Sequence, residues 1–380
     1  MSEHKNKIKV LVVDDSALMR KMIPVIISAD KDIEVVGTAM DGDFALNKIP
    51  QLRPDVITLD IDMPRMDGLT TLRSIVRDFG IPVILVSSLT KEGTEITLKG
   101  LEIGAFDFVP KPIEAISLHI SEISHKLIDK IKAAASCKPL RFKELTPIKI
   151  KTQPAVISAG SLTAKYVVAI GISTGGPQAL TEILPQFPDS FPFGILIVQH
   201  MPEGFTELFA RRLDSVCNIN VKEAADGDIV RPGLALIARG NKHLKVKRTH
   251  YGVVSVLSQA IEVSGHRPSA TVLFDSVAEG YGDSAIGIIM TGMGDDGVEG
   301  LGRIKEKGGL TIAQDEETSV IYGMPKVAVE KGYVDMVLRL DEIIPKLMMM
   351  AELTESRDST VKDVAELCHV GEHNGKIYDS

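Results

Sequence analysis

Tryptophan is absent from this chain of 380 residues, and aromatic residues make up only 4% of it. This scarcity argues against a surface that stacks sugars or the bases of single-stranded nucleic acid. Cysteine is also rare, because only Cys137, Cys217 and Cys368 occur, far apart in the chain. Neither a disulfide framework nor a zinc knuckle is therefore expected.

Long apolar runs and a positive charge balance are missing as well. The formal net charge of −8 argues against a general nucleic-acid binder. No apolar run approaches the roughly 20 residues of a membrane span, and the polar start leads into a strand without the core of a signal peptide. We expect a cytoplasmic protein without nucleic-acid partners or membrane insertion, and its length favours two domains.

What the first third of the chain does contain is an alternation of two patterns. Apolar, β-branched runs predict strands at 8–13, 33–39, 56–59, 82–86 and 106–109. Segments with helical spacing lie between and after them, near 16–23, 42–49, 67–79, 91–103 and 112–133. Such a βα repeat predicts an α/β fold, with a parallel sheet covered by helices on both faces.

Polar residues stand at the ends of these predicted strands, namely Asp14, Asp15, Asp60, Ser87 and Lys111. In a parallel sheet such residues meet at one edge. Carboxylates brought together repel one another, and a hard divalent cation such as Mg²⁺ is the usual relief. A carboxylate can also accept a phosphoryl group whose charge a metal and a lysine stabilise. One acid alone would be read as a solvated loop residue, but the set indicates a phospho-acceptor site.

The motifs at these strand ends resemble the response-regulator receiver family over about residues 7–130. They are Asp14-Asp15, Leu59-Asp60-Ile-Asp-Met-Pro-Arg-Met-Asp-Gly68, Val86-Ser87-Ser88 and Val109-Pro-Lys111-Pro112. The resemblance implies a flavodoxin-like, doubly wound receiver domain at 1–135. It further implies that Asp60 is phosphorylated, that Asp14, Asp15 and Asp60 bind Mg²⁺, and that Ser87 and Lys111 are switch residues.

Composition changes after the first domain. Residues 136–164 mix proline, lysine and small residues without a period, which is typical of an interdomain linker. A second domain is expected at 165–351. The remaining residues, 352–380, are polar and aperiodic, and we expect a disordered tail there.

The second domain opens with an apolar strand at 166–170 that ends in Gly171-Ile-Ser173-Thr-Gly175, followed by a helical pattern at 178–184. This fits the G-x-S-x-G elbow, in which glycines let the backbone turn sharply enough to expose a nucleophilic hydroxyl. A glycine-rich bend between strand and helix can equally bind a phosphate or serve as a plain connection. A nearby base and acid would favour the nucleophile.

Two later strand ends supply such partners. His200 follows the strand at 194–198, and an imidazole titrates near neutrality, which suits a general base. Asp295 and Asp296 follow the strand at 284–290, and either could orient the imidazole, while backbone N–H groups around Met293 could receive an oxyanion. The competing reading of this glycine-rich loop is a second phosphate or metal site.

A rival triad would use Ser173, Asp226 or Asp228, and His266, in the chain order of α/β-hydrolases. It is the weaker choice. Both aspartates lie in a segment that reads as a turn before a strand. His266 opens a predicted helix that runs to about residue 279, where it could instead line a substrate cleft.

The second domain resembles the chemotaxis protein-glutamate methylesterase family, and with the receiver the similarity spans about residues 7–350. The motifs are Gly-Ile-Ser173-Thr-Gly-Gly, Gln-His200-Met-Pro, His266-Arg-Pro-Ser, Thr-Gly-Met293-Gly-Asp-Asp296-Gly and Ala313-Gln-Asp-Glu-Glu-Thr-Ser-Val-Ile-Tyr-Gly-Met-Pro325. The resemblance implies a Rossmann-like catalytic domain with a triad of Ser173, His200 and Asp296 and an oxyanion-hole N–H from Met293. No cofactor is implied for the esterase reaction.

The resemblance also implies the reaction and the partners. Substrates would be glutamate methyl esters on methyl-accepting chemoreceptors, with deamidation of specific glutamines, and a chemotaxis histidine kinase would donate the phosphoryl group. We therefore predict a phosphorylation-regulated serine esterase. One alternative is a non-enzymatic response regulator with a partner-binding output domain. A nucleotide-binding domain is a second, although neither glycine-rich loop has the lysine of a P-loop.

Overall fold

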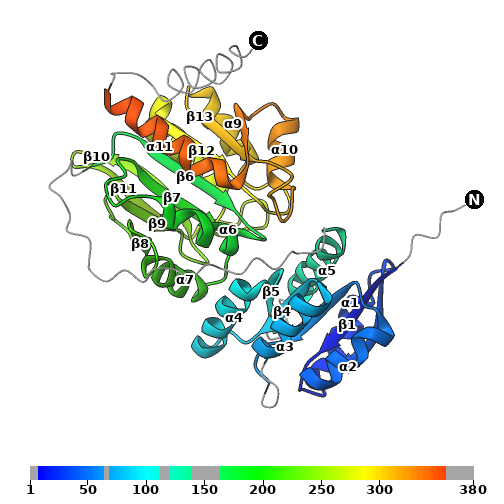
Figure 1. Cartoon of the computed structure of the whole chain (residues 1–380). Helices are drawn as coiled ribbons and strands as arrows, with labels where there is room; N and C mark the ends of the chain where they lie inside the picture. The colour runs from blue at the N-terminus through cyan, green and yellow to red at the C-terminus, as the bar shows by residue number, and fades with distance from the viewer. Residues whose placement is uncertain (1–6, 64–67, 112–119, 138–162, 357–380) are drawn as a thin grey trace, which may run out of the picture. The chain divides into compact units, whose positions relative to one another are not determined.

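The computed structural model describes residues 7–63, 68–111, 120–137 and 163–356. The chain divides into two compact units, Met1–Thr146 and Pro147–Ser380 (Figure 1). Most of the predicted linker and all of the tail beyond residue 356 lie outside the described residues. Among the described residues, no helix combines the length and apolarity needed to cross a membrane.

The first unit is a five-stranded parallel sheet in the order β2-β1-β3-β4-β5. Its strands are β1 Ile8–Val13, β2 Ile33–Ala39, β3 Val56–Asp60, β4 Val83–Ser87 and β5 Asp107–Pro110. Its helices are α1 Met19–Ile27, α2 Gly42–Leu52, α3 Gly68–Ser74 with its π-helical continuation η1 Ile75–Phe79, α4 Lys91–Ile103 and α5 Ile120–Ser136. This arrangement confirms the predicted doubly wound α/β fold.

The centre of this sheet explains why the first site forms where it does. All residues of β3 and β4 are buried, as their apolar sequences predict for strands covered on both faces. The strand order reverses on either side of β1, between β2 and β3, and in open α/β sheets ligands bind at such a switch point, beyond the carboxyl ends of the strands. Asp14 and Asp60 stand at those ends.

The second unit is a seven-stranded parallel sheet in the order β14-β13-β12-β6-β7-β9-β8, with a separate antiparallel hairpin. The sheet strands are β6 Val167–Ile172, β7 Gly194–Gln199, β8 Asn220–Glu223, β9 Leu234–Ile237, β12 Ala285–Ile289, β13 Leu310–Gln314 and β14 Met336–Leu338; the hairpin is β10 His243–Thr249 and β11 Gly252–Ser258. The helical segments are α6 Gly176–Ile183, η2 Leu184–Gln186, α7 Phe205–Asp214, α8 Ala270–Tyr281, η3 Gly282–Ser284, α9 Val298–Glu306, α10 Met324–Glu330 and α11 Leu340–Ser356.

The three central strands of this sheet bring distant residues to one edge. Ile172 pairs with Gln199 across β6 and β7, and Gly171 pairs with Ile289 across β6 and β12. The residues that follow these strands therefore emerge side by side. The second parallel sheet also confirms the predicted fold class.

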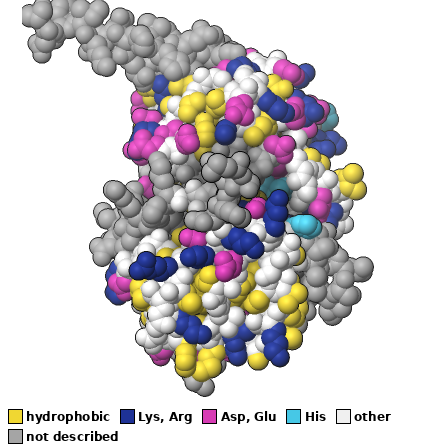
Figure 2. Space-filling view, turned by 90° about the vertical axis from the view of Figure 1, so that its right-hand side faces the viewer, with side chains coloured by type: hydrophobic (Ala, Val, Ile, Leu, Met, Phe, Trp, Pro, Cys, Tyr) yellow, Lys and Arg dark blue, Asp and Glu magenta, His cyan; other side chains and the backbone are white. Residues whose placement is uncertain are grey.

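The surface is mixed in character. On the face shown in Figure 2, basic and acidic side chains are interspersed, and hydrophobic side chains form scattered patches among them. On that face no single sign of charge dominates.

Candidate active site and phosphorylation site

Ser173 lies in the bend between β6 and α6, where two glycines allow close backbone packing. Gly175 has a left-handed φ of +80°, and a Cβ there would lie 2.6 Å from Val320 Cβ. A Cβ at Gly176 would lie 2.0 Å from the side-chain oxygen of Gln199. The backbone of Ser173 is held from both sides, because its N–H donates to the Thr291 carbonyl at 3.0 Å and its carbonyl accepts from Gln199 Nε2 at 3.1 Å.

His200 follows β7 directly and is paired with a carboxylate. Its backbone N–H donates to the carbonyl of Ile172, the residue before Ser173. Its Nε2 lies 2.8 Å from Asp296 Oδ2. Since an ionised carboxylate only accepts, Nε2 carries the hydrogen in the neutral ring, and Nδ1 keeps the lone pair. Nδ1 is buried and has no hydrogen-bond partner among the described residues.

Asp296 is buried but surrounded by hydrogen-bond donors. Besides His200, the donors are Ser269 Oγ at 2.6 Å, Ala270 N at 2.6 Å, Thr271 N at 3.3 Å and Thr271 Oγ1 at 2.9 Å. Three of these groups belong to the first residues of α8, whose N-terminus favours a negative charge. Burial alone would raise the pKa of Asp296, but the hydrogen bonds and charge of His200, together with Ser269 and Ala270, hold that pKa well below its usual range.

The loop after β12 separates the two adjacent aspartates. Asp296 is 1% exposed, whereas the side chain of Asp295 is exposed to solvent. Asp296 is therefore the carboxylate that faces His200. The same loop approaches the bend at Ser173, because a Cβ at Gly292 would lie 2.8 Å from Ser173 Cβ. Met293 follows directly and is half-buried.

The rival triad does not assemble. Asp226 accepts the backbone N–H of Leu257 in β11 at 2.6 Å, and Asp228 accepts that of Ala225 at 2.7 Å, so both carboxylates are engaged with backbone N–H groups. His266 does reach the site, but it stacks on the ring of His200, with 3.8 Å between ring centroids.

Sequence reasoning missed the residues that hold Asp296, above all Ser269 and Thr271. The signal was present. Ser269 is the N-cap of α8, and its side chain accepts the N–H of Val272. A helix start with several hydroxyl groups and free N–H donors is a natural partner for a buried anion.

Two imidazoles and a carboxylate also form a cluster that could in principle hold a metal, since ligand atoms of His200, His266 and Asp296 lie within 4.8 Å of one another. The carboxylate oxygens, however, already accept the hydrogen bonds described above. Asp296 Oδ2 accepts from His200 and Ala270, and Oδ1 accepts from Ser269 and Thr271. Both oxygens of Asp296 are therefore occupied by hydrogen bonds, and the carboxylate is placed to orient the imidazole and not to bind a cation.

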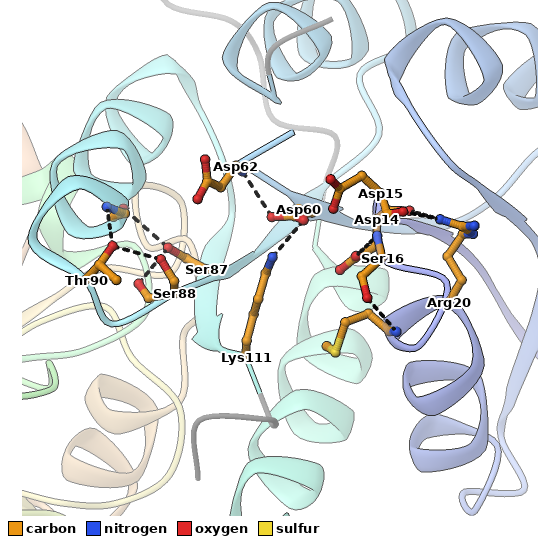
Figure 3. A network of polar contacts seen from close by, with 12 residues as sticks. Asp14, Asp15, Ser16, Arg20, Asp60, Asp62, Ser87, Ser88, Thr90 and Lys111 are labelled. Atoms are coloured by element: carbon orange, nitrogen blue, oxygen red, sulfur yellow. Dashed lines mark hydrogen bonds and ion pairs between the residues drawn. The ribbon is translucent and has the colours of Figure 1, made fainter. Parts of the chain in front are cut away.

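The first unit brings the predicted phosphorylation-site residues together at the carboxyl edge of its sheet (Figure 3). Lys111 Nζ lies 2.8 Å from Asp60 Oδ2, and the backbone N–H of Asp62 donates to Asp60 Oδ1 at 3.0 Å. Carboxylate oxygens of Asp14, Asp15 and Asp60 lie within 4.8 Å of one another. Arg20 holds the Asp14–Asp15 turn by donating to both backbone carbonyls.

Burial and neighbouring charges shift the pKa values of three groups at this site. Burial raises the pKa of Asp60 to about 7, the Lys111 hydrogen bond opposes this rise, and the charge of Asp14 adds to it. Burial also raises the pKa of Asp14. Burial would lower the pKa of Lys111, but its hydrogen bond to Asp60 and the charges of Asp60, Asp14 and Asp15 together outweigh burial and raise that pKa.

A hard divalent cation fits this set of residues. Three carboxylates share one ammonium group, and the buried Oδ2 of Asp14 has no hydrogen-bond partner among the described residues. Oxygen ligands of this kind suit Mg²⁺. A bound cation would also favour the ionised form of Asp60, against the burial and the Asp14 charge that raise its pKa.

Ser87, the predicted switch residue, is bonded to α4 and not to Asp60. Its hydroxyl lies 3.1 Å from the Ser88 carbonyl and 3.3 Å from the Gly93 carbonyl, and Thr97 Oγ1 donates to it at 2.6 Å. Figure 3 shows Ser87 beside Asp60, on the side of α4. The contacts with Gly93 and Thr97 link the end of β4 to α4.

Comparison with known proteins agrees with both halves of this description. Residues 168–347 match the family model of the CheB methylesterase, and residues 10–121 match that of the response regulator receiver domain. The chain is 51% identical over 348 residues to protein-glutamate methylesterase/protein-glutamine glutaminase 2 of Koribacter versatilis, with 90% of this chain and 96% of the relative covered. It is 48% identical over 348 residues to the corresponding protein of Pyrococcus horikoshii, with 91% and 94% covered.

Among solved structures, the CheB methylesterase catalytic domain of Thermotoga maritima is 45% identical, with a TM-score of 0.48, and the match covers 50% of this chain and 98% of that domain. The full-length relatives extend the match through both units of the chain. The chain therefore belongs to the protein-glutamate methylesterase/protein-glutamine glutaminase family, hydrolases of chemotaxis in which a response-regulator receiver domain precedes a CheB methylesterase domain.

Proposed function

We propose that this protein is a cytoplasmic serine esterase that removes methyl groups from glutamate methyl esters on chemoreceptors and deamidates specific receptor glutamines. The names of its relatives support both activities. The observation that carries the proposal is the His200–Asp296 pair, in which one imidazole nitrogen is fixed at 2.8 Å and the other keeps its lone pair. Its place beside the bend of Ser173 supports the assignment of the nucleophile.

In the proposed reaction, Ser173 Oγ attacks the ester carbonyl and its proton passes to His200 Nδ1. Asp296 orients the ring and stabilises the imidazolium. The N–H of Met293 would receive the oxyanion. The ring then gives its proton to the leaving methoxy oxygen, methanol departs, and an acyl-serine remains. His200 next takes a proton from the water that attacks the acyl group, and returns it to Ser173 Oγ as the acyl–oxygen bond breaks. The glutamate side chain leaves as an acid, and Ser173 and His200 regain their starting states.

The same groups can act on a glutamine side chain. The amide carbonyl takes the place of the ester carbonyl, and ammonia leaves in place of methanol. Both routes pass through the same acyl-serine, so a second set of catalytic groups is unnecessary. This common intermediate supports a dual activity.

We further propose that Asp60 accepts a phosphoryl group from a chemotaxis histidine kinase and that this controls the esterase. Asp14, Asp15 and Asp60 would hold Mg²⁺, which when bound neutralises charge on the phosphoryl oxygens. Lys111, 2.8 Å from Asp60, would pair with the transferred group. Ser87 would turn from Gly93 to a phosphoryl oxygen, which changes its contact with α4.

The test is methanol release from methylated receptor membranes. Wild type should release methanol, and release should rise with Mg²⁺ and a small phosphodonor such as acetyl phosphate. Ser173→Ala should lose release in both states, whereas Asp60→Asn should keep the basal rate and lose the stimulation. Methanol release by Ser173→Ala at the wild-type rate would overturn the assignment of Ser173 as the nucleophile. Stimulation that persists in Asp60→Asn would overturn the phosphorylation site.

A further inference from the structure

The ring of His266 lies flat against the ring of His200. Their centroids are 3.8 Å apart and their planes differ by 15°. The contact joins residues that are far apart in the chain, because the β10–β11 hairpin lies between them in sequence. The two rings are therefore nearly parallel and in direct contact through their faces.

His266 is itself held in place. Its Nδ1 lies 2.6 Å from the carbonyl of Ser264, and its backbone pairs in both directions with Val263. Ser264 and Gly265 both have positive φ, of 51° and 71°, which closes a tight turn before His266.

The next residue braces this turn against a neighbouring loop. Arg267 donates to Asn241 Oδ1 at 2.7 Å and to the Ala260 carbonyl at 3.1 Å. The ring of His266 is therefore presented by a braced turn, so it can restrain a neighbour.

One continuous segment serves both members of the His200–Asp296 pair. The turn that carries His266 leads through Arg267 and Pro268 into α8, whose first residues donate to Asp296. Residues 264–271 therefore contact the carboxylate with one end and the imidazole with the other. A shift of this segment would move both groups together.

A single hydrogen bond does not orient an imidazole completely. The bond from Nε2 to Asp296 fixes one ring nitrogen but leaves the plane of the imidazole unfixed, and that plane sets where Nδ1 points. A second ring on its face restrains that plane. We propose that His266 is a positioning residue that keeps the Nδ1 lone pair of His200 directed at Ser173 by stacking. The inference rests on the proposed esterase function.

The experiment compares three substitutions in the full chain by methanol release from methylated receptor membranes. His266→Phe keeps a ring face but has no ring nitrogen. His266→Asn keeps a polar N–H near the place of Nδ1 but has no ring. His266→Ala has neither. Because a small misplacement of a catalytic group can lower a rate about a hundredfold, we expect kcat to fall about 10–100-fold in the Ala and Asn variants, while KM stays within about twofold.

The Phe variant should recover kcat to within about threefold of wild type. A small fluorophosphonate that labels Ser173 should follow the same order of rates, since labelling requires an activated serine but no receptor contact. His250→Ala, an exposed histidine in the β10–β11 turn, is the matched control and should label like wild type.

The outcomes separate the inference from the function on which it rests. Recovery by Asn and not by Phe, or a loss confined to KM, would overturn positioning by stacking. Wild-type rates in His266→Ala would overturn it as well. Absence of methanol release and of Ser173 labelling in wild type would instead overturn the esterase function.

Discussion

Each unit has a buried aspartate at the carboxyl edge of a parallel sheet, and the two behave in opposite ways. Asp60 is fully buried and Asp296 is 1% exposed. Burial nevertheless raises the pKa of Asp60 to about 7, whereas the pKa of Asp296 lies well below its usual range. The difference lies in the groups around each carboxylate.

Asp296 receives hydrogen bonds from His200, from the N-cap Ser269 and from the first residues of α8, which are all donors. Asp60 accepts hydrogen bonds from Lys111 and from one backbone N–H. Carboxylate oxygens of Asp60, Asp14 and Asp15 also lie within 4.8 Å of one another. Donors therefore decide what burial does to a carboxylate. Asp296 is suited to remain an anion that orients an imidazole, while Asp60 is suited to gain a cation and a phosphoryl group.

The largest effect is expected where the permanent anion is removed. Asp296→Asn replaces an acceptor of several hydrogen bonds with an amide that can present a donor to His200 Nε2. This favours the wrong tautomer, so kcat for methanol release should fall about 10³–10⁴-fold, as expected for loss of the orienting carboxylate of a triad. Asp295→Asn is the matched control, because Asp295 is exposed, and its rate should stay within about twofold. Equal losses in both variants would contradict the assignment.

At Asp60, removing the carboxylate is expected to stabilise the protein, which is a smaller effect than the loss of rate at Asp296. Its pKa is about 7 in the folded protein and about 4 in an unfolded chain. Between these values the folded state binds more protons, so this group's contribution to stability declines as pH rises through the window. In Mg²⁺-free buffer, Asp60→Asn should therefore stabilise the receiver by about 2–4 kcal/mol at pH 8 and by far less at pH 4.

Calorimetric unfolding of the full chain at both pH values measures this difference. The Tm of the receiver transition should rise in the variant by about 5–15 °C at pH 8. Mg²⁺ should raise the Tm of wild type more than that of the variant, because the cation stabilises the buried carboxylate of Asp60, which the variant lacks. A Tm difference that does not change with pH would contradict a raised pKa at Asp60.

The strands, the helices and the residues at the strand ends were largely predictable from the sequence. Alternating patterns predicted a strand at 56–59 and a helix at 91–103, where the structure has β3 Val56–Asp60 and α4 Lys91–Ile103. Parallel strands collect chemistry at one edge, so strand-end residues such as Asp60, Ser173 and His200 were identifiable before their distances were known. Local patterns are sufficient when the architecture itself brings residues together.

The orientation of side chains was not predictable in the same way. Asp295 and Asp296 are adjacent and chemically identical, and only the path of the loop into α9 directs one to the interior. The stack of His266 on His200 depends on a turn braced by Arg267 and Asn241, residues without a local signal for that contact. Such features depend on packing between segments distant in sequence.

The smallest effect is expected when one of the several hydrogen-bond donors to Asp296 is removed. Ser269 both donates to Asp296 Oδ1 at 2.6 Å and caps α8. Ser269→Ala should reduce stability by about 1 kcal/mol through the lost cap. It should also lower kcat about 3–10-fold, since the donors from His200, Ala270 and Thr271 remain. The rate and the Tm are measured on the same preparation.

A second helix cap separates these two roles of Ser269. Asp41 caps α2 in the receiver by accepting the N–H of Phe44 at 2.9 Å. Asp41→Ala should lose a similar amount of stability but keep the basal esterase rate, because it removes the cap of a receiver helix and leaves α8 unchanged. If Ser269→Ala lost stability and kept its full rate, the hydroxyl would serve the helix alone. The ionised state of Asp296 would then depend on His200, the backbone N–H groups at the start of α8 and the hydroxyl of Thr271. The contrast with Asp60 would come from His200 and the first turn of α8.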